Sequence, residues 1–320
     1  MYAAVVHSFD APPRFTTFAD PVAAEGELLV IVTAAALHPI VKSLANGTHY
    51  GSTGELPFVP GVDGVGRLDD GSRVFFGISR SPFGTFSERA LAAKWTCIPL
   101  PDGLDDVTAA AIANPAMSSW VALTARAKFV AGESVLILGA TGVAGRLAVQ
   151  IAKRLGARRV IAAGRNPQAL ETLKELGADV VVPLEMEHDS LVAAYRSEFA
   201  KAGVEVVLDY LWGHPAELLF EAISQKGLQK TGSRLRYVQI GESAGRTISL
   251  PAATLRSSGV ELLGSGFGSA SLDQIHTAVV EFFKIAATRP FQFNTKTAPL
   301  RDVERLWNSS EEGTRLVFRP

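Results

Sequence analysis

From Gly132 onward, the apolar and polar positions of the chain alternate between two regular patterns. Short β-branched runs bounded by glycine, beginning with SVLILG and RVIAAG, predict buried strands. Each run precedes a longer segment with apolar residues three and four apart, such as VAGRLAVQIAKRLG and PQALETLKELG, which predicts an amphipathic helix. The alternation continues through DVVVPL, VEVVLDYL and LRYVQIG. It predicts an α/β fold with a parallel sheet covered by helices.

The first hundred residues have a different pattern. Short apolar or alternating runs such as YAAVVHSF, ELLVIVTAAAL and FSERALAAKWTCIPL are separated by Gly, Pro and Asp, and they predict a β-rich part. Between Pro101 and Lys128 the sequence is alanine-rich and predicts a helix, with Asp102 or Asp105 as its N-cap. The end of the chain, DVERLWNSSEEGTRLVFRP, predicts one more helix and one strand.

Composition narrows the class of protein. The 320 residues are 47% hydrophobic, and 31 Lys and Arg against 32 Asp and Glu give a formal net charge of -1, so we do not expect a nucleic-acid partner. The sequence has no apolar run of membrane length and no secretory signal pattern, and we expect a cytoplasmic protein with no membrane association. Its single cysteine, Cys97, permits no intrachain disulfide, and its six histidines lack metal-ligand spacing.

A glycine-rich turn follows the first strand of the alternating region. Gly139, Gly142 and Gly145 stand between SVLIL and a helix that we expect to start near Val143. Glycine lets backbone N–H groups approach a pyrophosphate, and the positive end of the helix dipole points at the anion. Glycines also occur in ordinary strand–helix turns. The strand before the turn, the helix after it and the second strand about 20 residues on together favour a dinucleotide site.

The end of the second strand distinguishes between the two nicotinamide dinucleotides. An NAD site usually has Asp or Glu here to bind the ribose 2′-hydroxyl, whereas this chain has Gly164, Arg165 and Asn166. Glycine leaves room for a 2′-phosphate, and a guanidinium binds phosphate through two hydrogen bonds. Arg165 is alternatively a solvated loop arginine. The missing acid favours NADPH as the cofactor.

The order of these elements resembles that of the medium-chain dehydrogenase/reductase superfamily, and within it the zinc-free quinone oxidoreductase branch. Three further segments carry the resemblance: ELPFVPGVDGVGRL, FGTFSERA and SSWVAL. It extends over nearly the whole chain. It implies a Rossmann domain, a doubly wound parallel sheet, at residues 118–284. It also implies a β-rich GroES-like catalytic domain at residues 1–117 and 285–320, and a homodimer joined through GVELLGSGF.

The chain departs from the zinc-dependent members of that superfamily at the metal ligands. Their cysteine ligand corresponds to a position near Pro39, and their histidine ligand to Val62. Their four-cysteine lobe corresponds to a segment with Cys97 alone. Without a Lewis acid, the expected substrates are quinones and enones (α,β-unsaturated carbonyl compounds), which accept hydride readily. Two alternatives stay open: an enoyl-thioester reductase, and an NADPH-binding sensor or scaffold with little turnover.

The resemblance also implies roles for individual residues in binding NADPH. Residues 140–143 are expected along the pyrophosphate, 164–166 around the 2′-phosphate, and Ser118, Gly241 and residues 267–268 on the nicotinamide side. A flexible glycine loop is an equally good interpretation of residues 267–268. The implied cofactor-binding residues are Ser118, Ala140, Thr141, Gly142, Val143, Gly164, Arg165, Asn166, Gly241, Phe267 and Gly268.

Tyr50 is the candidate catalytic residue, because it corresponds to a tyrosine common in that branch. Its phenol would donate a hydrogen bond or a proton to the developing oxyanion. The family pattern Gly-x-Tyr is interrupted here by one extra residue, in GTHY, which makes His49 an alternative proton donor and leaves water as a third. A loop tyrosine also commonly packs or lines a pocket wall.

Three other residues near strand ends have structural interpretations. Asp63 is expected to bind backbone groups rather than to react, and Asp209 to have a structural or solvated role. Trp212 is expected either to line the substrate pocket or to pack in the core.

Overall fold

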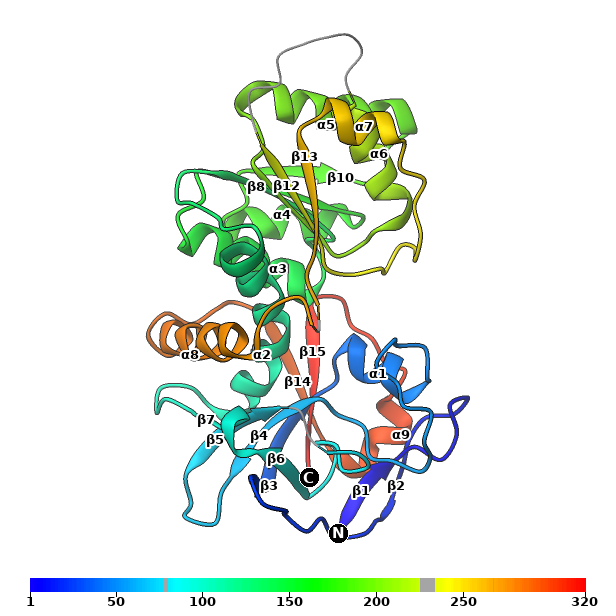
Figure 1. Cartoon of the computed structure of the whole chain (residues 1–320), viewed down its shortest axis with the longest axis vertical. Coiled ribbons are helices and arrows are strands. Elements are labelled where there is room, and N and C mark those ends of the chain that lie inside the picture. The colour runs from blue at the N-terminus through cyan, green and yellow to red at the C-terminus, as the bar shows by residue number, and fades with distance from the viewer. Residues whose placement is uncertain (78–79, 225–233, 267) are drawn as a thin grey trace. The chain divides into compact units, whose positions relative to one another are not determined.

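Six parallel strands form the sheet that the alternating pattern predicts (Figure 1). In the computed structural model, which describes every residue except 78–79, 225–233 and 267, their order is β10-β9-β8-β11-β12-β13. Numbered along the chain from β8, this order is 3-2-1-4-5-6, which is that of the dinucleotide-binding Rossmann sheet. The strands are β8 (Ser134–Leu138), β9 (Arg159–Gly164), β10 (Val180–Pro183), β11 (Val206–Asp209), β12 (Leu235–Gln239) and β13 (Val260–Gly264).

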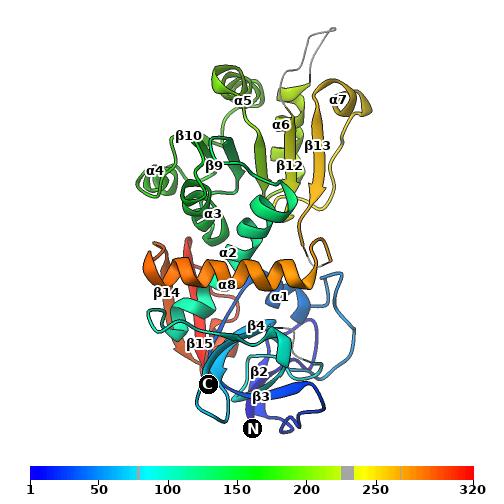
Figure 2. The same cartoon turned by 60° about the vertical axis from the view of Figure 1, so that its left-hand side comes forward.

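The helices cover both faces of this sheet. The chain moves outward from β8 through β9 to β10, so right-handed crossovers place α3 and α4 on one face, and the return through β11 to β13 places the later helices on the other. Figure 2 shows β10 and β13 at the two edges of the sheet. The helices are α3 (Val143–Arg154), α4 (Pro167–Glu175), α5 (His188–Ala202), α6 (Gly213–Ile223) and α7 (Ala252–Ser257).

The β-rich part contains a second sheet, in which antiparallel pairs predominate. Its order is β14-β15-β3-β4-β5-β7 with β6 added on β3, while β1 and β2 form a separate antiparallel pair. Fully buried aromatic rings, among them Phe76, Phe86 and Phe318, fill its core. The strands are β1 (Tyr2–Val5), β2 (Arg14–Thr17), β3 (Glu27–Ala36), β4 (Asp63–Arg67), β5 (Arg73–Gly77), β6 (Arg89–Ala93), β7 (Ile98–Pro99), β14 (Asn294–Pro299) and β15 (Thr314–Arg319).

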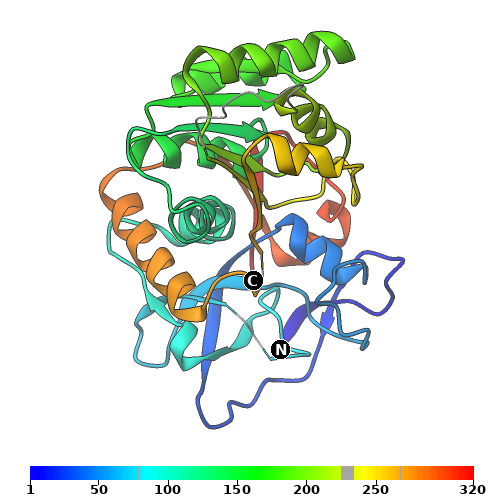
Figure 3. The ribbon, with the colours of Figure 1, turned by 45° about the horizontal axis from the view of Figure 1, so that its top comes forward.

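The two sheets belong to two compact units of the chain. The β-rich unit comprises Met1–Asn114 and Val279–Pro320, and the Rossmann unit comprises Pro115–Ala278. The chain passes between the units within two continuous helices, α2 (Asp106–Val121) and α8 (Leu272–Thr288), of which α8 is seen in full in Figures 2 and 3. The predicted domain limits, 1–117 with 285–320 and 118–284, stay a prediction.

The remaining helical segments are short, and one of them directly continues α2. They are α1 (Pro39–Ala45), η1 (Lys94–Thr96), the π-helical continuation η2 (Ala122–Arg126), η3 (Leu300–Asp302) and α9 (Val303–Leu306). The Asp105 carboxylate accepts a hydrogen bond from the Thr108 N–H at 2.9 Å, so Asp105 rather than Asp102 caps the start of α2. None of the helices in the described part of the chain is long and apolar enough to cross a bilayer.

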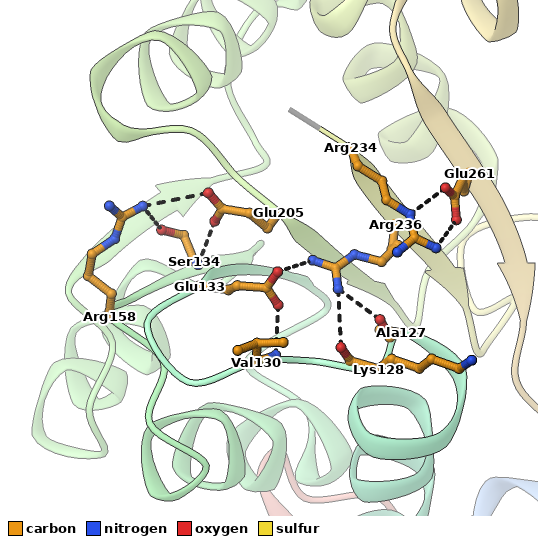
Figure 4. Close-up of polar contacts among 10 residues, drawn as sticks. All are labelled: Ala127, Lys128, Val130, Glu133, Ser134, Arg158, Glu205, Arg234, Arg236 and Glu261. Atoms are coloured by element: carbon orange, nitrogen blue, oxygen red, sulfur yellow. Dashed lines mark hydrogen bonds and ion pairs between the residues drawn. The ribbon is translucent and has the colours of Figure 1, made fainter. Parts of the chain in front are cut away.

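Ion pairs gather at the amino ends of the Rossmann strands (Figure 4). The Arg236 side chain is almost fully buried, and it donates to the Ala127 carbonyl at 2.8 Å while pairing with the Glu133 carboxylate. It thereby links β12 to the segment between η2 and β8. Three ion pairs at these strand ends are drawn in Figure 4: Arg236–Glu133, Arg158–Glu205 and Arg234–Glu261.

Arg236→Met is expected to destabilise the fold. The substitution removes the counter-charge of the half-buried Glu133 carboxylate, which keeps, among the described residues, only the Val130 N–H as a donor, and it removes a donor to the Ala127 carbonyl. We expect a cost of about 2–4 kcal/mol of unfolding free energy. The midpoint of urea unfolding, followed by circular dichroism, should therefore fall. The matched control is Arg234→Gln, two residues away, whose ion pair with Glu261 is exposed and should leave the midpoint unchanged. A midpoint of Arg236→Met equal to that of the wild-type chain would show that the buried pair contributes nothing to stability.

Candidate functional site

The predicted glycine turn places the start of α3 directly against β8 and β9. A Cβ atom on Gly145 would lie 2.3 Å from the Gly139 carbonyl oxygen, so no side chain fits between the helix and the turn. The N–H groups of Gly139 and Ala140 both donate to the Ala163 carbonyl of β9, at 3.0 and 2.9 Å. These bonds hold the turn onto the sheet, and they leave the amide of Ala140 unable to face a ligand.

The first turn of α3 remains open to an anion. Gly142 is the N-cap and is exposed, and no side chain caps the helix. Thr141 is half-buried and Val143 is buried at the first helical position. Uncapped N–H groups at the positive end of a helix of this length form an anion-binding site. The predicted binding of pyrophosphate by residues 140–143 stays a prediction. It depends on the N–H groups of Thr141 and Val143, because that of Ala140 donates to Ala163 and that of Gly142 donates to the Gly139 carbonyl at 3.3 Å.

The end of β9 lies beside this turn. Gly164 is buried, and a Cβ atom there would lie 2.5 Å from the Thr141 Cγ2 atom, so a larger residue would push into the turn. Asn166 caps α4, with its Oδ1 atom accepting from the Ala169 N–H at 3.1 Å. Arg165 is exposed, and its guanidinium makes no ion pair with any residue that the structure describes. Of the three residues predicted around a 2′-phosphate, Arg165 is therefore the available cation, while the Asn166 side chain already has a capping role.

A buried carboxylate organises the carboxyl end of β11. Asp209 is fully buried and accepts hydrogen bonds from the Tyr237 hydroxyl at 2.6 Å and from the N–H groups of Leu211 and Trp212 at 2.8 and 3.0 Å. Burial raises the pKa of Asp209, while these three donors oppose the rise. The carboxylate holds the backbone at Trp212, where φ is +56°, a conformation that costs a non-glycine residue about 1–3 kcal/mol. Asp209 is structural, as one of its two interpretations predicts, and it is not solvated.

Trp212 itself packs on aromatic neighbours. Its ring is half-buried, and it makes edge contacts with Phe220 and Tyr237, whose centroids both lie 6.3 Å away. Of its two predicted roles, the structure shows the packing one.

Tyr210, which the sequence pattern does not point to, contacts Ser118, one of the predicted nicotinamide-side residues. Its hydroxyl lies 3.3 Å from the Ser118 hydroxyl, which donates to the Pro115 carbonyl at 2.7 Å. Burial raises the pKa of Tyr210 to about 12, so its phenol stays protonated and able to donate to Ser118. Gly241 lies two residues past the end of β12, and its N–H donates to the Asp209 carbonyl at 3.1 Å. Ser118 and Gly241 thus converge at the carboxyl end of β11, beside β8.

The position of Tyr210 in the sequence is informative in retrospect. It directly follows a strand that adjoins β8, where the strand order reverses, and ligands of open α/β sheets bind at this reversal point. The pattern does not predict its hydroxyl contact, because Ser118 is 92 residues away in the chain.

The segment after β13 contributes less to the described site. Gly268 is exposed with φ at +87°, a left-handed conformation that favours glycine. Phe267 lies outside the described residues. A nicotinamide contact through these two backbone groups stays a prediction.

Tyr50 and His49 lie in the β-rich unit, between α1 and β4. The Tyr50 side chain is 76% exposed, and its ring centroid lies 4.2 Å from that of His49. The His49 Nδ1 atom accepts from the Gly51 N–H at 3.0 Å, which orients the imidazole. Exposure leaves the Tyr50 hydroxyl accessible, whereas His49 is half-buried. The catalytic role of either residue stays a prediction.

A buried group of ionisable side chains lies next to Pro39 and Val62, the positions that the sequence resemblance aligns with zinc ligands. His38 is fully buried beside Pro39, and its Nε2 atom lies 3.4 Å from the Oδ1 atom of Asp63, which follows Val62. Asp63 therefore faces a histidine rather than backbone groups, contrary to expectation. Burial lowers the pKa of His38 although Asp63 opposes this, which favours a neutral imidazole.

Arg315 belongs to the same buried group. It donates to the Leu37 carbonyl at 2.7 Å, and burial lowers its pKa to about 10. Within the described ranges, no three histidine, cysteine, aspartate or glutamate side chains form a group that could hold a metal ion.

Comparison with known proteins places this geometry in a family. The model of the family "Zinc-binding dehydrogenase" matches residues 144–284, a range that contains neither Pro39 nor Val62. The chain is 27% identical to the "Probable NADPH-dependent quinone reductase tdiC" of Emericella nidulans, with 100% of both chains covered. It is 30% identical over 224 residues to the quinone oxidoreductase of Homo sapiens, which covers 66% of each chain.

Solved structures with a similar fold include a further quinone oxidoreductase. The quinone oxidoreductase of Thermus thermophilus, studied alone and in complex with NADPH, has a TM-score of 0.81 and 24% identity, with 100% of both chains covered. This likeness extends to the β-rich sheet as well as the Rossmann sheet. The chain belongs to the medium-chain dehydrogenase/reductase family, in its quinone oxidoreductase-like branch.

Proposed function

We propose that this chain is an NADPH-dependent reductase that transfers hydride to quinones or to enones. The observation that carries the proposal is the end of β9, where buried Gly164 and exposed Arg165 stand at the position of the acid that binds an NAD ribose. The quinone reductase names of the relatives from Emericella nidulans and Homo sapiens support the same substrate class.

The residues around the glycine turn fit the cofactor. The uncapped first turn of α3 suits a pyrophosphate, and the unpaired Arg165 guanidinium suits a 2′-phosphate. The Ser118 hydroxyl, fixed by Tyr210 and Pro115, would orient the nicotinamide side. When bound, NADPH supplies the hydride. The protein then has to position the acceptor and stabilise the charge that develops on its oxygen.

We further propose that the reaction needs no metal. Pro39 and Val62 cannot act as ligands, and the neighbouring His38 imidazole is fully buried against Asp63. A quinone or an enone places negative charge on an oxygen, which a hydrogen-bond donor stabilises without a Lewis acid. Tyr50, with an exposed phenol, is the proposed donor to that oxygen.

A homodimer and a cytoplasmic location are also part of the proposal. Strand β13 forms one edge of the Rossmann sheet, and the side chain of Leu262 is exposed on it. An edge strand of this kind can pair with the same strand of a second chain. The expected pairing lies within the segment GVELLGSGF.

The purified chain should oxidise NADPH when a simple quinone or an enone is added. The absorbance at the NADPH band reports the rate, and prior treatment with a strong zinc chelator should not change it. Loss of activity on chelation would contradict the metal-independent proposal. NADPH binding without turnover of any quinone or enone would instead favour a sensor or scaffold, and activity restricted to enoyl thioesters would favour the thioester reductase.

Arg165→Ala should weaken NADPH binding selectively. Removing one guanidinium from the 2′-phosphate is expected to raise the Kd for NADPH about 10- to 100-fold. The Kd for NADH should stay constant, because NADH has no phosphate at this position. Titration of the nicotinamide fluorescence measures both constants. Equal affinities of the wild-type chain for the two cofactors, unaffected by the substitution, would refute the NADPH assignment and identify Arg165 as a solvated loop residue.

Tyr50→Phe should lower kcat with little effect on the KM for NADPH. A proton or hydrogen-bond donor acts on the developing oxyanion, so its loss is expected to cost about 10²-fold in rate. The steady-state rate with an enone measures this effect, since saturation of the carbon–carbon bond requires a proton. The comparison variant is His49→Gln. A normal rate for Tyr50→Phe together with a slow His49→Gln would transfer the role to His49, and normal rates for both would favour water.

A further inference from the structure

Arg146 is a half-buried arginine without an acidic partner. It lies one turn into α3, where its own N–H donates to the Gly142 carbonyl at 2.9 Å. Its guanidinium donates from Nη1 to the Thr172 hydroxyl of α4 at 3.1 Å, and its Nε atom is buried with no hydrogen-bond partner. Among the described residues, none of the carboxylates pairs with it.

Two other arginines of the Rossmann unit with little side-chain exposure have acidic partners. Arg236 pairs with Glu133, and Arg159 pairs with Glu198. Burying a guanidinium without a counter-charge costs folding free energy, so buried guanidinium groups are normally paired with an anion. Arg146 therefore has hydrogen-bonding capacity and charge that suit an anion and that its contacts with the described residues leave unused.

Arg146 contacts α4, the helix that begins directly after Arg165 and Asn166. The Thr172 hydroxyl that it contacts donates to the Ala169 carbonyl at 2.8 Å, and the Ala169 N–H donates to the capping Asn166 side chain. Thr172 and Asn166 are six residues apart, which is about 9 Å along a helix axis. The Arg146 guanidinium lies beside the second turn of α4, and rotation about its side-chain bonds toward the amino end of α3 moves it toward the first turn of α4.

Two arginines that have no acidic partner among the described residues thus adjoin α4, one directly before its N-cap and one beside Thr172 in its second turn. Arg165 precedes the N-cap of α4 directly, and Arg146 approaches from the neighbouring helix. The end of β9 lies against the Thr141 side chain, since a Cβ atom on Gly164 would lie 2.5 Å from the Thr141 Cγ2 atom. A phosphate at this point would accept hydrogen bonds from both arginines, which a hydroxyl group could not match.

We propose that Arg146 is a second ligand of the 2′-phosphate of NADPH, and so determines, with Arg165, the preference for NADPH over NADH. This inference rests on the proposed function. On binding, the guanidinium leaves Thr172 or shares its donors with the phosphate. A purely structural role, in which Arg146 only ties α3 to α4, would affect NADPH and NADH equally.

The test compares binding of two nucleotide fragments, 2′,5′-ADP and 5′-ADP, to the full-length chain by isothermal titration calorimetry. They differ in the 2′-phosphate, so their affinity ratio reports on that subsite alone. Arg146→Gln is expected to weaken 2′,5′-ADP binding about 10- to 100-fold and to leave 5′-ADP binding unchanged. Arg146→Lys, which keeps the charge but loses the planar fork, should give a smaller loss of the same kind.

Two control variants separate phosphate binding from other effects. Thr172→Val removes the tie between α3 and α4 but keeps the guanidinium, and it should retain the preference for 2′,5′-ADP. Lys174→Gln removes one positive charge from the far end of α4, where Lys174 pairs with Glu171, and it should also retain the preference. Thermal unfolding of each variant checks that it folds, and Arg146→Lys provides the measurement if Arg146→Gln does not fold.

The outcomes distinguish this inference from the proposed function. A wild-type chain that prefers 2′,5′-ADP, with the preference retained in Arg146→Gln and Arg146→Lys, would overturn the role of Arg146 and leave the NADPH assignment standing. A wild-type chain without that preference would overturn both. Equal weakening of both fragments by Arg146→Gln, matched by Thr172→Val, would show that Arg146 acts only as a tie between the helices.

Discussion

The close approach of α3 to the turn after β8 is the constraint on which the rest of the Rossmann unit depends. A Cβ atom at position 145 would collide with the Gly139 carbonyl, so only glycine lets the helix begin there. Because α3 begins immediately after the turn and has no side-chain cap, its unpaired N–H groups face the carboxyl edge of the sheet. That edge is also where the strand order reverses between β8 and β11. One packing contact therefore decides where an anionic cofactor can bind.

The amino ends and the carboxyl ends of the strands in this sheet differ in how their charged side chains are paired. At the amino ends of the strands, arginines meet glutamates, as in the pair of Arg236 with Glu133, and the protein neutralises its own charges (Figure 4). Near the carboxyl ends, Arg165 and Arg146 have no acidic partner in the described part of the chain. Asp209 is the buried acid of that edge, and its hydrogen bonds go to Tyr237 and to backbone N–H groups. The positive charges that remain are those that a phosphorylated ligand can neutralise.

The β-rich unit contains a buried group of ionisable side chains. His38 and Asp63, which lie next to Pro39 and Val62 in the chain, face each other in the protein interior, and Arg315 belongs to the same group. Burial lowers the pKa of His38 and favours its neutral imidazole, so the histidine adds no positive charge to this group. The chemistry proposed for the chain then depends on hydrogen-bond donors such as Tyr50, which is accessible because it lies on a loop.

Local sequence determined much of this protein. The periodicity of apolar residues predicted the parallel sheet with its helices, and the glycine spacing predicted the turn before Val143, because both depend on neighbours in the chain. The missing acid after Gly164 likewise indicated NADPH from two or three residues. Only the tertiary structure showed that Tyr210 contacts Ser118, and that Arg146 has no acidic partner among the described residues. Those facts depend on which side chains meet across distant elements and on which charges lose water, and neither is encoded in the order of residues along a single helix or strand.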